Sequence, residues 1–170
     1  MIILTTDRLI IREFDISDAK AMFDLNSDKE VLKYTGDVAF ESVGKTKDFL
    51  SNYPDYEKNG FGRWIVELKG TNEILGWCGL KKHEDGKVDI GYRFYQKEWG
   101  KGYATEAARA CLEYGFELLE LEEILGNSAI ENKKSIRVFD KLGMKFIENK
   151  TCDGIEDAVR YRISKNEFLK

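Results

Sequence analysis

The spacing of hydrophobic residues along this chain alternates between two periods, and each period predicts a different kind of element. The clearest helical stripe, with apolar or small residues every three or four positions, comprises Ala104, Ala107, Ala108, Cys111, Leu112, Gly115, Phe116 and Leu119. This spacing is typical of one buried face of a helix of about four turns. Directly upstream, residues 88–95 are rich in β-branched and aromatic side chains, which predicts a strand. The order here is therefore strand, short loop, long helix.

The remaining elements follow from the same patterns and from capping residues. Strands are predicted at residues 9–14, 61–68, 74–81, 123–129, 144–149 and 158–164, and shorter helices at 17–25, 42–53 and 135–142. Ser17 and Ser42 can cap the first two of these helices, and Gly143 can end the third. No repeat, low-complexity tract or proline-rich linker divides the chain. We therefore expect one α+β domain over residues 1–170, with a mixed sheet and helices on both faces.

The loop before the long helix carries Gly100 and Gly102. Glycine permits positive φ and lets a ligand approach the backbone closely. The first N–H groups of a helix have no partner within it and lie at the positive end of its dipole, so loop and helix together can seat a phosphate or diphosphate. A dinucleotide fingerprint would need a third glycine where Thr105 stands, and no P-loop pattern is present. Taken alone, the loop is equally consistent with a tight strand-to-helix turn.

Composition and charge narrow the functional classes. The 170 residues are 42% hydrophobic and carry a formal net charge of −4, which gives no reason to expect nucleic-acid binding. Cys78, Cys111 and Cys152 lack the spacing of a zinc site or disulfide framework and are interpreted as buried thiols in a reducing compartment. His83, the one histidine, lies at a predicted hairpin tip and is expected to be exposed and without a role. With no signal-peptide pattern and no bilayer-spanning stretch, we expect a cytoplasmic protein with no membrane partner and no metal.

Four short motifs occur in a fixed order: Asp89-Ile90-Gly91-Tyr92, the glycine loop, Glu131-Asn132-Lys133-Lys134-Ser135 and Lys141-Leu142-Gly143-Met144. In this order and spacing they resemble the GNAT superfamily of acyl-CoA-dependent N-acyltransferases. The opening Thr6-Asp7-Arg8-Leu9-Ile10-Ile11-Arg12 is similar to the start of the branch that includes the ribosomal-protein N-terminal acetyltransferases. The resemblance covers essentially the whole chain. It implies a three-layer α/β arrangement, a mostly antiparallel sheet between helices, with acetyl-CoA as the cosubstrate.

The resemblance also implies where the cofactor binds. The pyrophosphate is expected on the backbone amides of Trp99, Gly100, Lys101, Gly102, Tyr103 and Ala104, and the pantetheine arm along Tyr92, Arg93 and Phe94. In the family, this strand is bent away from the next one, which frees its backbone groups. Asn132 matches the family position that hydrogen-bonds the cofactor arm, although taken alone it is more typical of a helix N-cap.

Acyl transfer to an amine requires removal of a proton, support for the oxyanion and departure of a thiolate. Asp89 stands where many relatives carry Glu and is the candidate base, directly or through a water; the alternative is a solvated carboxylate at a sheet edge. A main-chain N–H near Tyr92 would support the oxyanion. Many relatives protonate the thiolate with a tyrosine, but Phe139 occupies that position. Ser135, one turn earlier on the same helix face, is the candidate donor, and its alternative is an N-cap or a small core residue.

We expect N-acetylation of a primary amine, and the branch resemblance suggests a protein N-terminus. Small-molecule amines (polyamines, amino acids or antibiotics) are the alternative acceptors. Phe139 motivates a second class, a non-catalytic CoA-binding regulatory module, and a nucleotide-binding fold on the same loop is a third. The acceptor site is expected in the first half of the chain, where aromatic and acidic residues gather, without assignment to particular residues. The protein is expected to be a monomer or a homodimer.

Overall fold

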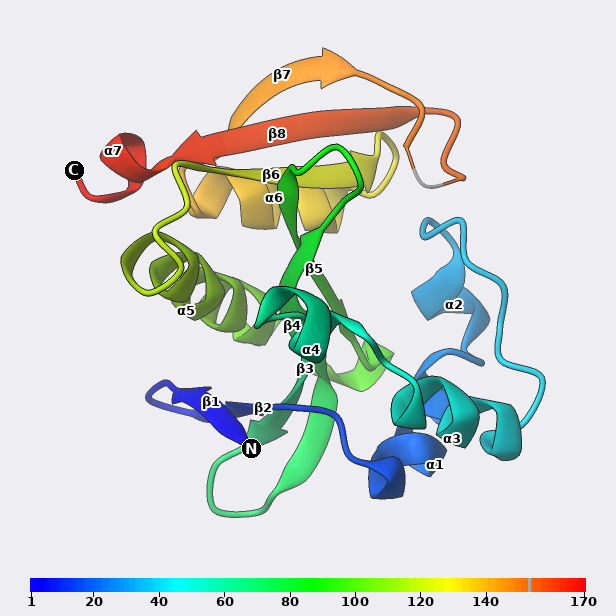
Figure 1. Ribbon diagram of the computed structural model, residues 1–170. Helices are drawn as coiled ribbons and strands as arrows, with labels where there is room; N and C mark the ends of the chain where they lie inside the picture. Colours follow the sequence, from blue (N-terminus) through cyan, green and yellow to red (C-terminus); the bar gives the residue numbers. More distant parts are fainter. Residues whose placement is uncertain (153) are drawn as a thin grey trace.

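Among the residues that the structure describes, eight strands pair into one sheet, in the spatial order β1-β2-β3-β4-β5-β6-β8-β7 (Figure 1). The computed structural model describes residues 1–152 and 154–170. The strands are β1 (Ile2–Thr5), β2 (Leu9–Arg12), β3 (Arg63–Leu68), β4 (Glu73–Lys82), β5 (Val88–Phe94), β6 (Glu123–Ala129), β7 (Lys145–Asn149) and β8 (Ala158–Ser164). Neighbouring strands are antiparallel except β5 and β6, which are parallel. The predicted α+β fold with a mixed, mostly antiparallel sheet is confirmed.

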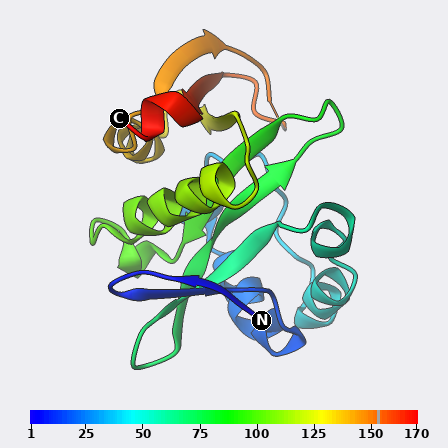
Figure 2. The same ribbon diagram turned by 60° about the vertical axis from the view of Figure 1, so that its left-hand side comes forward.

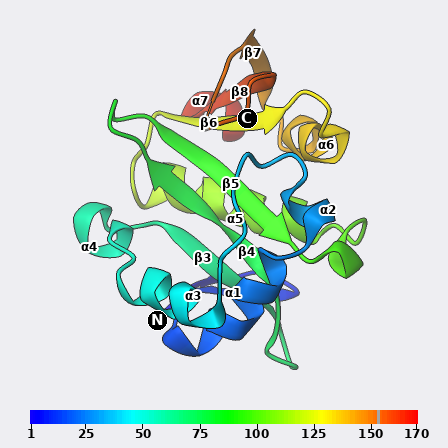
Figure 3. The ribbon, with the colours of Figure 1, turned by 90° about the vertical axis from the view of Figure 1, so that its right-hand side faces the viewer.

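Helices cover both faces of this sheet. On one face, α5 (Tyr103–Glu117) packs on β4 and β5, and α6 (Lys133–Lys141) packs beside it on β6. On the other face lie α1 (Ala19–Leu25), α3 (Val43–Ser51) and α4 (Asp55–Asn59) (Figures 2 and 3). The shorter elements are η1 (Ile16–Asp18), α2 (Lys29–Leu32), η2 (Gln96–Glu98) and α7 (Lys165–Phe168). Within the described residues, every helix is too short or too polar to cross a bilayer.

The predicted helical stripe is the buried face of α5. Ala108, Cys111, Leu112 and Phe116 each have 0% exposure. Small side chains on this face let the helix lie close to the sheet, and a Cβ on Gly115 would stand only 2.7 Å from Ile124 Cδ1 of β6. This packing holds the start of α5 directly after the end of β5, which is where the glycine loop must lie.

The hydrophobic pattern did not predict some of the short elements. β1, α2, α4 and α7 have only four or five residues each, too few to show a period. The predicted strand at residues 9–14 ends at Arg12, because Asp15 then begins a 3-10 turn. Asp15, rather than Ser17, is the cap of that turn: its side chain accepts from the Ser17 N–H. Ser42 caps α3 as predicted.

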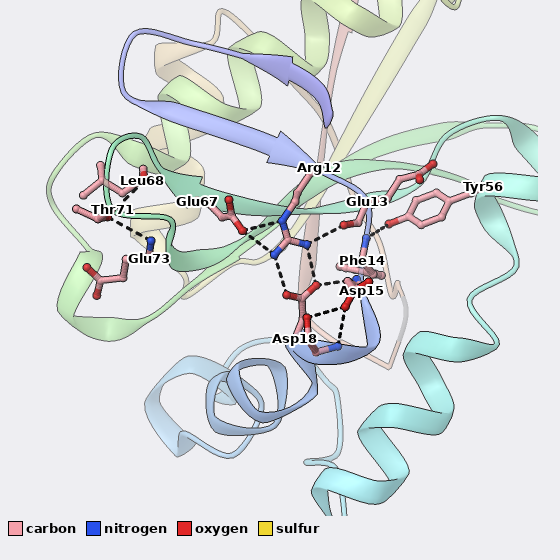
Figure 4. Close-up of polar contacts among 11 residues, drawn as sticks. Arg12, Glu13, Phe14, Asp15, Asp18, Tyr56, Glu67, Leu68, Thr71 and Glu73 are labelled. Carbon is pink, nitrogen blue, oxygen red and sulfur yellow. Dashed lines mark hydrogen bonds and ion pairs between the residues drawn. The ribbon is translucent and has the colours of Figure 1, made fainter. Parts of the chain in front are cut away.

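A buried ion cluster ties the first helical segment to the sheet (Figure 4). Arg12 of β2 donates to both oxygens of Asp18, at 2.8 and 2.7 Å, and to Glu67 of β3 at 2.6 Å. Asp18 is 2% exposed and Glu67 is 9% exposed. The hydrogen bonds to Asp18 raise the pKa of Arg12, and the hydrogen bond to Glu67 adds to this effect. Desolvation acts in the opposite direction but is outweighed, so the guanidinium stays charged. One arginine thus pairs with two buried carboxylates and ties the segment that leads into α1 to β2 and β3.

Arg12→Ala is expected to lower the free energy of unfolding by about 3 kcal/mol or more, because it leaves two buried carboxylates without their cation. Urea denaturation followed by circular dichroism measures this. Lys20→Ala is the matched control: Lys20 pairs with Asp24 at 2.6 Å on the surface, and the loss should stay below about 1 kcal/mol. Equal effects of the two substitutions would contradict the structural role of the cluster.

Candidate active site

The strands β5 and β6 diverge at the centre of the sheet (Figure 3). In the described residues, their parallel pairing consists of Asp89 with Leu125 and Ile90 with Gly126. From Gly91 to Phe94, β5 continues to pair with β4. Its other edge therefore presents backbone N–H and C=O groups to a space that an extended molecule with amide groups can enter as an added strand. The separation of this strand from the next one, which the family resemblance implies, is present.

The glycine loop has the backbone that an anion seat requires. Gly100 and Gly102 have φ of +78° and +84°, a region that other residues rarely adopt. Gly102 is the N-cap of α5 and supplies no side-chain hydrogen bond to the first turn. The first N–H groups of α5 therefore have no acceptor in the side chain of their N-cap residue. Because the loop follows β5 directly, this positive helix end lies at the open end of the gap between β5 and β6.

Two lysines near the glycine loop, Lys97 of η2 and Lys101, are already paired with carboxylates. Lys97 Nζ lies 2.5 Å from Glu73, and Lys101 Nζ lies 2.9 Å from Glu98. The loop therefore offers its backbone amides more readily than free cations. The structure brings in a cation that the sequence did not indicate: Lys134 of α6 stands 4.4 Å from the ring centre of Trp99. A charged amine thus lies at the open end of the gap.

Three candidate residues meet where α6 begins. The Tyr92 hydroxyl lies 3.0 Å from the Ser135 hydroxyl and donates to the Ser135 carbonyl oxygen at 3.0 Å. Asn132 caps α6, with its side-chain oxygen accepting from the Ser135 N–H at 3.3 Å. Burial raises the pKa of Tyr92, so it stays protonated. Phe139 is 1% exposed and packs in the core with its ring edge-on to Tyr92.

Asp89 lies on the opposite face of β5 from Tyr92 and is 5% exposed. The expected alternative, a solvated carboxylate at a sheet edge, is therefore wrong. One oxygen accepts from Arg63 at 2.8 Å, and the other lies 2.8 Å from His83 Nε2. Burial by itself would raise the pKa of Asp89, but the charge of Arg63 and the hydrogen bond from His83 lower it to about 2. Asp89 is thus a fixed anion whose two oxygens are both engaged.

The expectation that His83 is fully exposed is wrong. Its side chain is 27% exposed and forms a pair with Asp89. The hairpin register explains this: Lys81 is the cross-strand partner of Asp89, so His83, two residues further, projects from the same face. Both side chains line a cavity of about 220 Å³ that also contacts Asn127, Cys152 and Arg160. The hydrophobic pattern could not reveal the pair, although the register of the hairpin could have.

The side chain of Arg93 does not lie along the open edge of β5. It donates to Asn26 at 2.6 Å and to Asp37 at 2.5 Å, and its guanidinium lies 5.3 Å from the ring centre of Trp77. These contacts belong to the face that carries α1. Arg93 therefore holds the segment after α2 against the sheet, and its backbone alone remains for a ligand in the gap.

A second cavity, of about 330 Å³, lies between the segment after α2 and the end of β6. Its lining includes Tyr34, Gly36, Glu131 and Asp157. An aromatic ring and two carboxylates suit a cationic group. Across the described residues, no three His, Cys, Asp or Glu side chains are grouped so as to hold a metal ion.

Comparison with known families agrees with this geometry. Residues 8–145 match the model of the acetyltransferase (GNAT) domain family. The chain belongs to the GNAT family. An uncharacterized N-acetyltransferase of Bacillus licheniformis, p20, is 31% identical to this GNAT protein over 97% of both chains. The protein is accordingly an acetyltransferase, of the family whose cosubstrate is acetyl-CoA.

Solved structures show the same fold. An acetyltransferase of the GNAT family from Bacillus anthracis aligns with a TM-score of 0.81 and 33% identity, covering 98% of this chain and 100% of that one. A spermidine N-acetyltransferase from Vibrio cholerae, solved with CoA and spermine, aligns with a TM-score of 0.82 and 20% identity, covering 97% and 100%. At that identity, the likeness establishes the GNAT fold alone. Membership of the ribosomal-protein branch stays a prediction.

Proposed function

We propose that this GNAT protein transfers the acetyl group of acetyl-CoA to a primary amine by direct attack of the amine on the thioester. The observation that carries the proposal is the separation of β5 from β6 immediately after Ile90. An extended chain that enters beside the glycine loop and follows the open edge of β5 ends next to Asp89. The reacting atoms would then meet where β5 and β6 separate, and groups on both faces of the sheet could reach them there.

The open edge and the uncapped start of α5 fit a cofactor that carries a diphosphate and two amide groups. We assign the diphosphate to the backbone amides of residues 99–104, and the amide-bearing arm to the backbone of residues 92–94. Asn132 can contribute to the arm only with the part of its side chain that capping α6 leaves unused. Bound acetyl-CoA supplies the activated acyl group, and a main-chain N–H near Tyr92 supports the oxyanion.

Removal of the amine proton is assigned to Asp89 acting through His83. A carboxylate with a pKa of about 2 cannot take a proton from an ammonium to any useful extent. It can orient the imidazole 2.8 Å away. The proton then passes through water to His83 and on to the cavity that His83 lines. On the other face, the Ser135 hydroxyl, held by Tyr92, is the donor to the leaving sulfur.

This arrangement favours an acceptor that loses its proton easily. With an ordinary pKa of about 7.7 to 8.0, a good fraction of a protein N-terminal amine is neutral near pH 7.5, whereas a lysine-like amine at about 10.4 is neutral to roughly one part in a thousand. A site without a strong base therefore suits the N-terminal amine. We propose that acceptor, as in the ribosomal-protein branch that the opening motif resembles.

A small-molecule amine is the second candidate acceptor. Two relatives are named spermidine N(1)-acetyltransferase: one from Vibrio cholerae, 23% identical, and one from Escherichia coli, 24% identical. The cavity lined by Glu131 and Asp157 would suit such a cation. Thiol release from acetyl-CoA decides between the candidates when it is assayed on peptides with free N-termini, the same peptides blocked but carrying lysine, polyamines, amino acids and aminoglycosides.

We expect turnover with free N-terminal peptides and none with their blocked forms. Preferential turnover of spermidine would overturn the N-terminal acceptor and leave the acetyltransferase chemistry in place. A preparation that binds CoA by calorimetry but acetylates no amine of the panel would overturn the catalytic proposal, and would favour a CoA-binding regulatory module.

A further inference from the structure

A side chain from the opening motif reaches the glycine loop from outside the proposed cofactor site. Arg8 lies in the turn between β1 and β2, which Figure 2 shows close to the start of α5. Its Nε and Nη2 both lie 2.6 Å from one oxygen of Glu106. The other oxygen of Glu106 accepts from Thr6 Oγ1 at 2.6 Å and from the Arg8 N–H at 3.0 Å. The first turn of α5 is thereby tied to the β1–β2 turn.

The same guanidinium contacts three successive residues of the loop. Its Nη1 donates to the carbonyl oxygen of Lys101 at 3.0 Å. Its Nη2 would lie 3.3 Å from a Cβ on Gly102, and its Cζ stands 4.6 Å from the ring centre of Tyr103. The loop is therefore held at the residues where its backbone turns from β5 into the helix. The planar fork of an arginine can make these contacts together, and the single ammonium of a lysine cannot.

The position of Glu106 shows what the contacts between Arg8 and the loop can do. A carboxylate in the first turn of α5 places negative charge at the end of the helix where we assign a diphosphate. Although burial opposes it, hydrogen bonds from Thr6 and Arg8 lower the pKa of Glu106, so it is ionised. Its charge alone would weaken anion binding. Its geometry does the opposite, because it holds Arg8 against the loop.

We propose that Arg8 and Glu106 are positioning residues that fix the glycine loop in the conformation in which its N–H groups meet the diphosphate. This inference rests on the proposed cofactor site. The pair orders the loop before the cofactor binds. Without the pair, the loop would have to become ordered on binding, which would weaken the affinity for the cofactor. Neither residue needs to touch the cofactor for this effect.

Glu106→Gln separates positioning from electrostatics, because the two roles predict changes of opposite sign. The substitution is nearly isosteric and removes the negative charge. A positioning role predicts that the Kd for CoA, measured by isothermal titration calorimetry, rises by about tenfold or more, as expected when a charge-assisted contact is lost. A purely electrostatic role predicts tighter binding. Unchanged or tighter binding by folded Glu106→Gln would overturn the inference.

Arg8→Lys and Arg8→Ala test whether the planar guanidinium of Arg8 is needed to hold the loop. Both are expected to weaken CoA and 3′-dephospho-CoA by the same factor, because both ligands carry the diphosphate. Retained affinity in Arg8→Lys would show that charge suffices, and loss confined to CoA would place Arg8 on the 3′-phosphate; either result overturns the positioning role. Arg109→Lys is the matched control, since Arg109 lies on α5 and donates to the Lys141 carbonyl oxygen at 2.9 Å. Its Kd for CoA should stay within twofold of the unsubstituted protein.

The failure of this inference and the failure of the cofactor assignment give different results. If the unsubstituted protein gives no heat with CoA, the cofactor site itself is wrong. If it binds CoA and the Arg8 and Glu106 variants bind equally well, the site stands and the positioning pair does not. Circular dichroism of each variant, with its melting temperature, confirms that the affinities compare folded proteins.

Discussion

Asp89→Asn is expected to lower kcat/KM for amine acetylation by about 10² to 10⁴, the usual contribution of a positioned acid–base group, because it would release the His83 that Asp89 orients. The Kd for CoA should change less than twofold. The separation of the two effects follows from the fold. Asp89 faces His83 and Arg63 on one side of β5, whereas Tyr92 and the start of α6 lie on the other. Steady-state kinetics and calorimetry on the same preparation measure both quantities.

Two further variants show whether Asp89 acts through His83 or only holds the structure. If Asp89 works by orienting His83, His83→Gln should lose most of the same activity, and Arg63→Gln should lose less. If the ion pair with Arg63 is what matters, the order reverses, and the proton path through His83 is wrong. With the pKa of Asp89 at about 2, Asp89 does not titrate between pH 5 and 9. Any change of kcat/KM with pH inside that range therefore comes from another group.

The same pKa predicts how Asp89 affects stability. A carboxyl group whose pKa falls from 3.8 to about 2 on folding stabilises the native state above pH 3.8, and that contribution is lost as the pH falls toward 2. The difference in free energy of unfolding between the protein and Asp89→Asn should therefore shrink between pH 4 and pH 2. Urea denaturation at several pH values checks the trend, and a difference that is constant with pH would contradict the ion pairing of Asp89.

The local structure around the proposed cofactor site could be predicted from the sequence because each of its features depends on neighbouring residues. Gly100 and Gly102 adopt positive φ between a strand and a helix that the hydrophobic pattern itself predicts. Ser135 lies on the first turn of the predicted short helix, next to its cap. Each of these features depends on residues within about one turn of helix or one strand, where periodicity and capping rules apply.

The side-chain contacts of Asp89 and Arg93 could not be predicted in the same way because they join segments far apart in sequence. Arg63 reaches Asp89 across β4, and this path is open only because a side chain at Gly91 is absent: a Cβ there would lie 2.6 Å from the guanidinium. The family resemblance places Arg93 along the cofactor arm, but its side chain turns to Asn26 and Asp37. Such pairings depend on sheet order and on the loops that cover it, which no local pattern specifies.

Gly102→Val is expected to abolish measurable CoA binding, a loss of at least about 100-fold, since it removes the conformation on which the anion seat depends. Gly102 has φ of +84°, which a β-branched residue adopts only with strain, and its Cβ would stand 3.3 Å from Arg8 Nη2. Valine would also add two methyl groups beside the first N–H groups of α5. Calorimetry with CoA, at concentrations up to 100 times the Kd of the unsubstituted protein, measures the loss.

Backbone strain alone could unfold a protein, so the control must carry the same strain elsewhere. Gly70→Val does so: Gly70 has φ of +83°, a Cβ there meets no atom within 4 Å, and it lies in the turn between β3 and β4, away from the glycine loop. Both variants should lose similar melting temperature, by the cost of valine at positive φ, and Gly70→Val should bind CoA normally. If folded Gly102→Val also binds CoA normally, the diphosphate does not bind to these amides. The proposed route of the cofactor from the glycine loop to Asp89 would then be wrong.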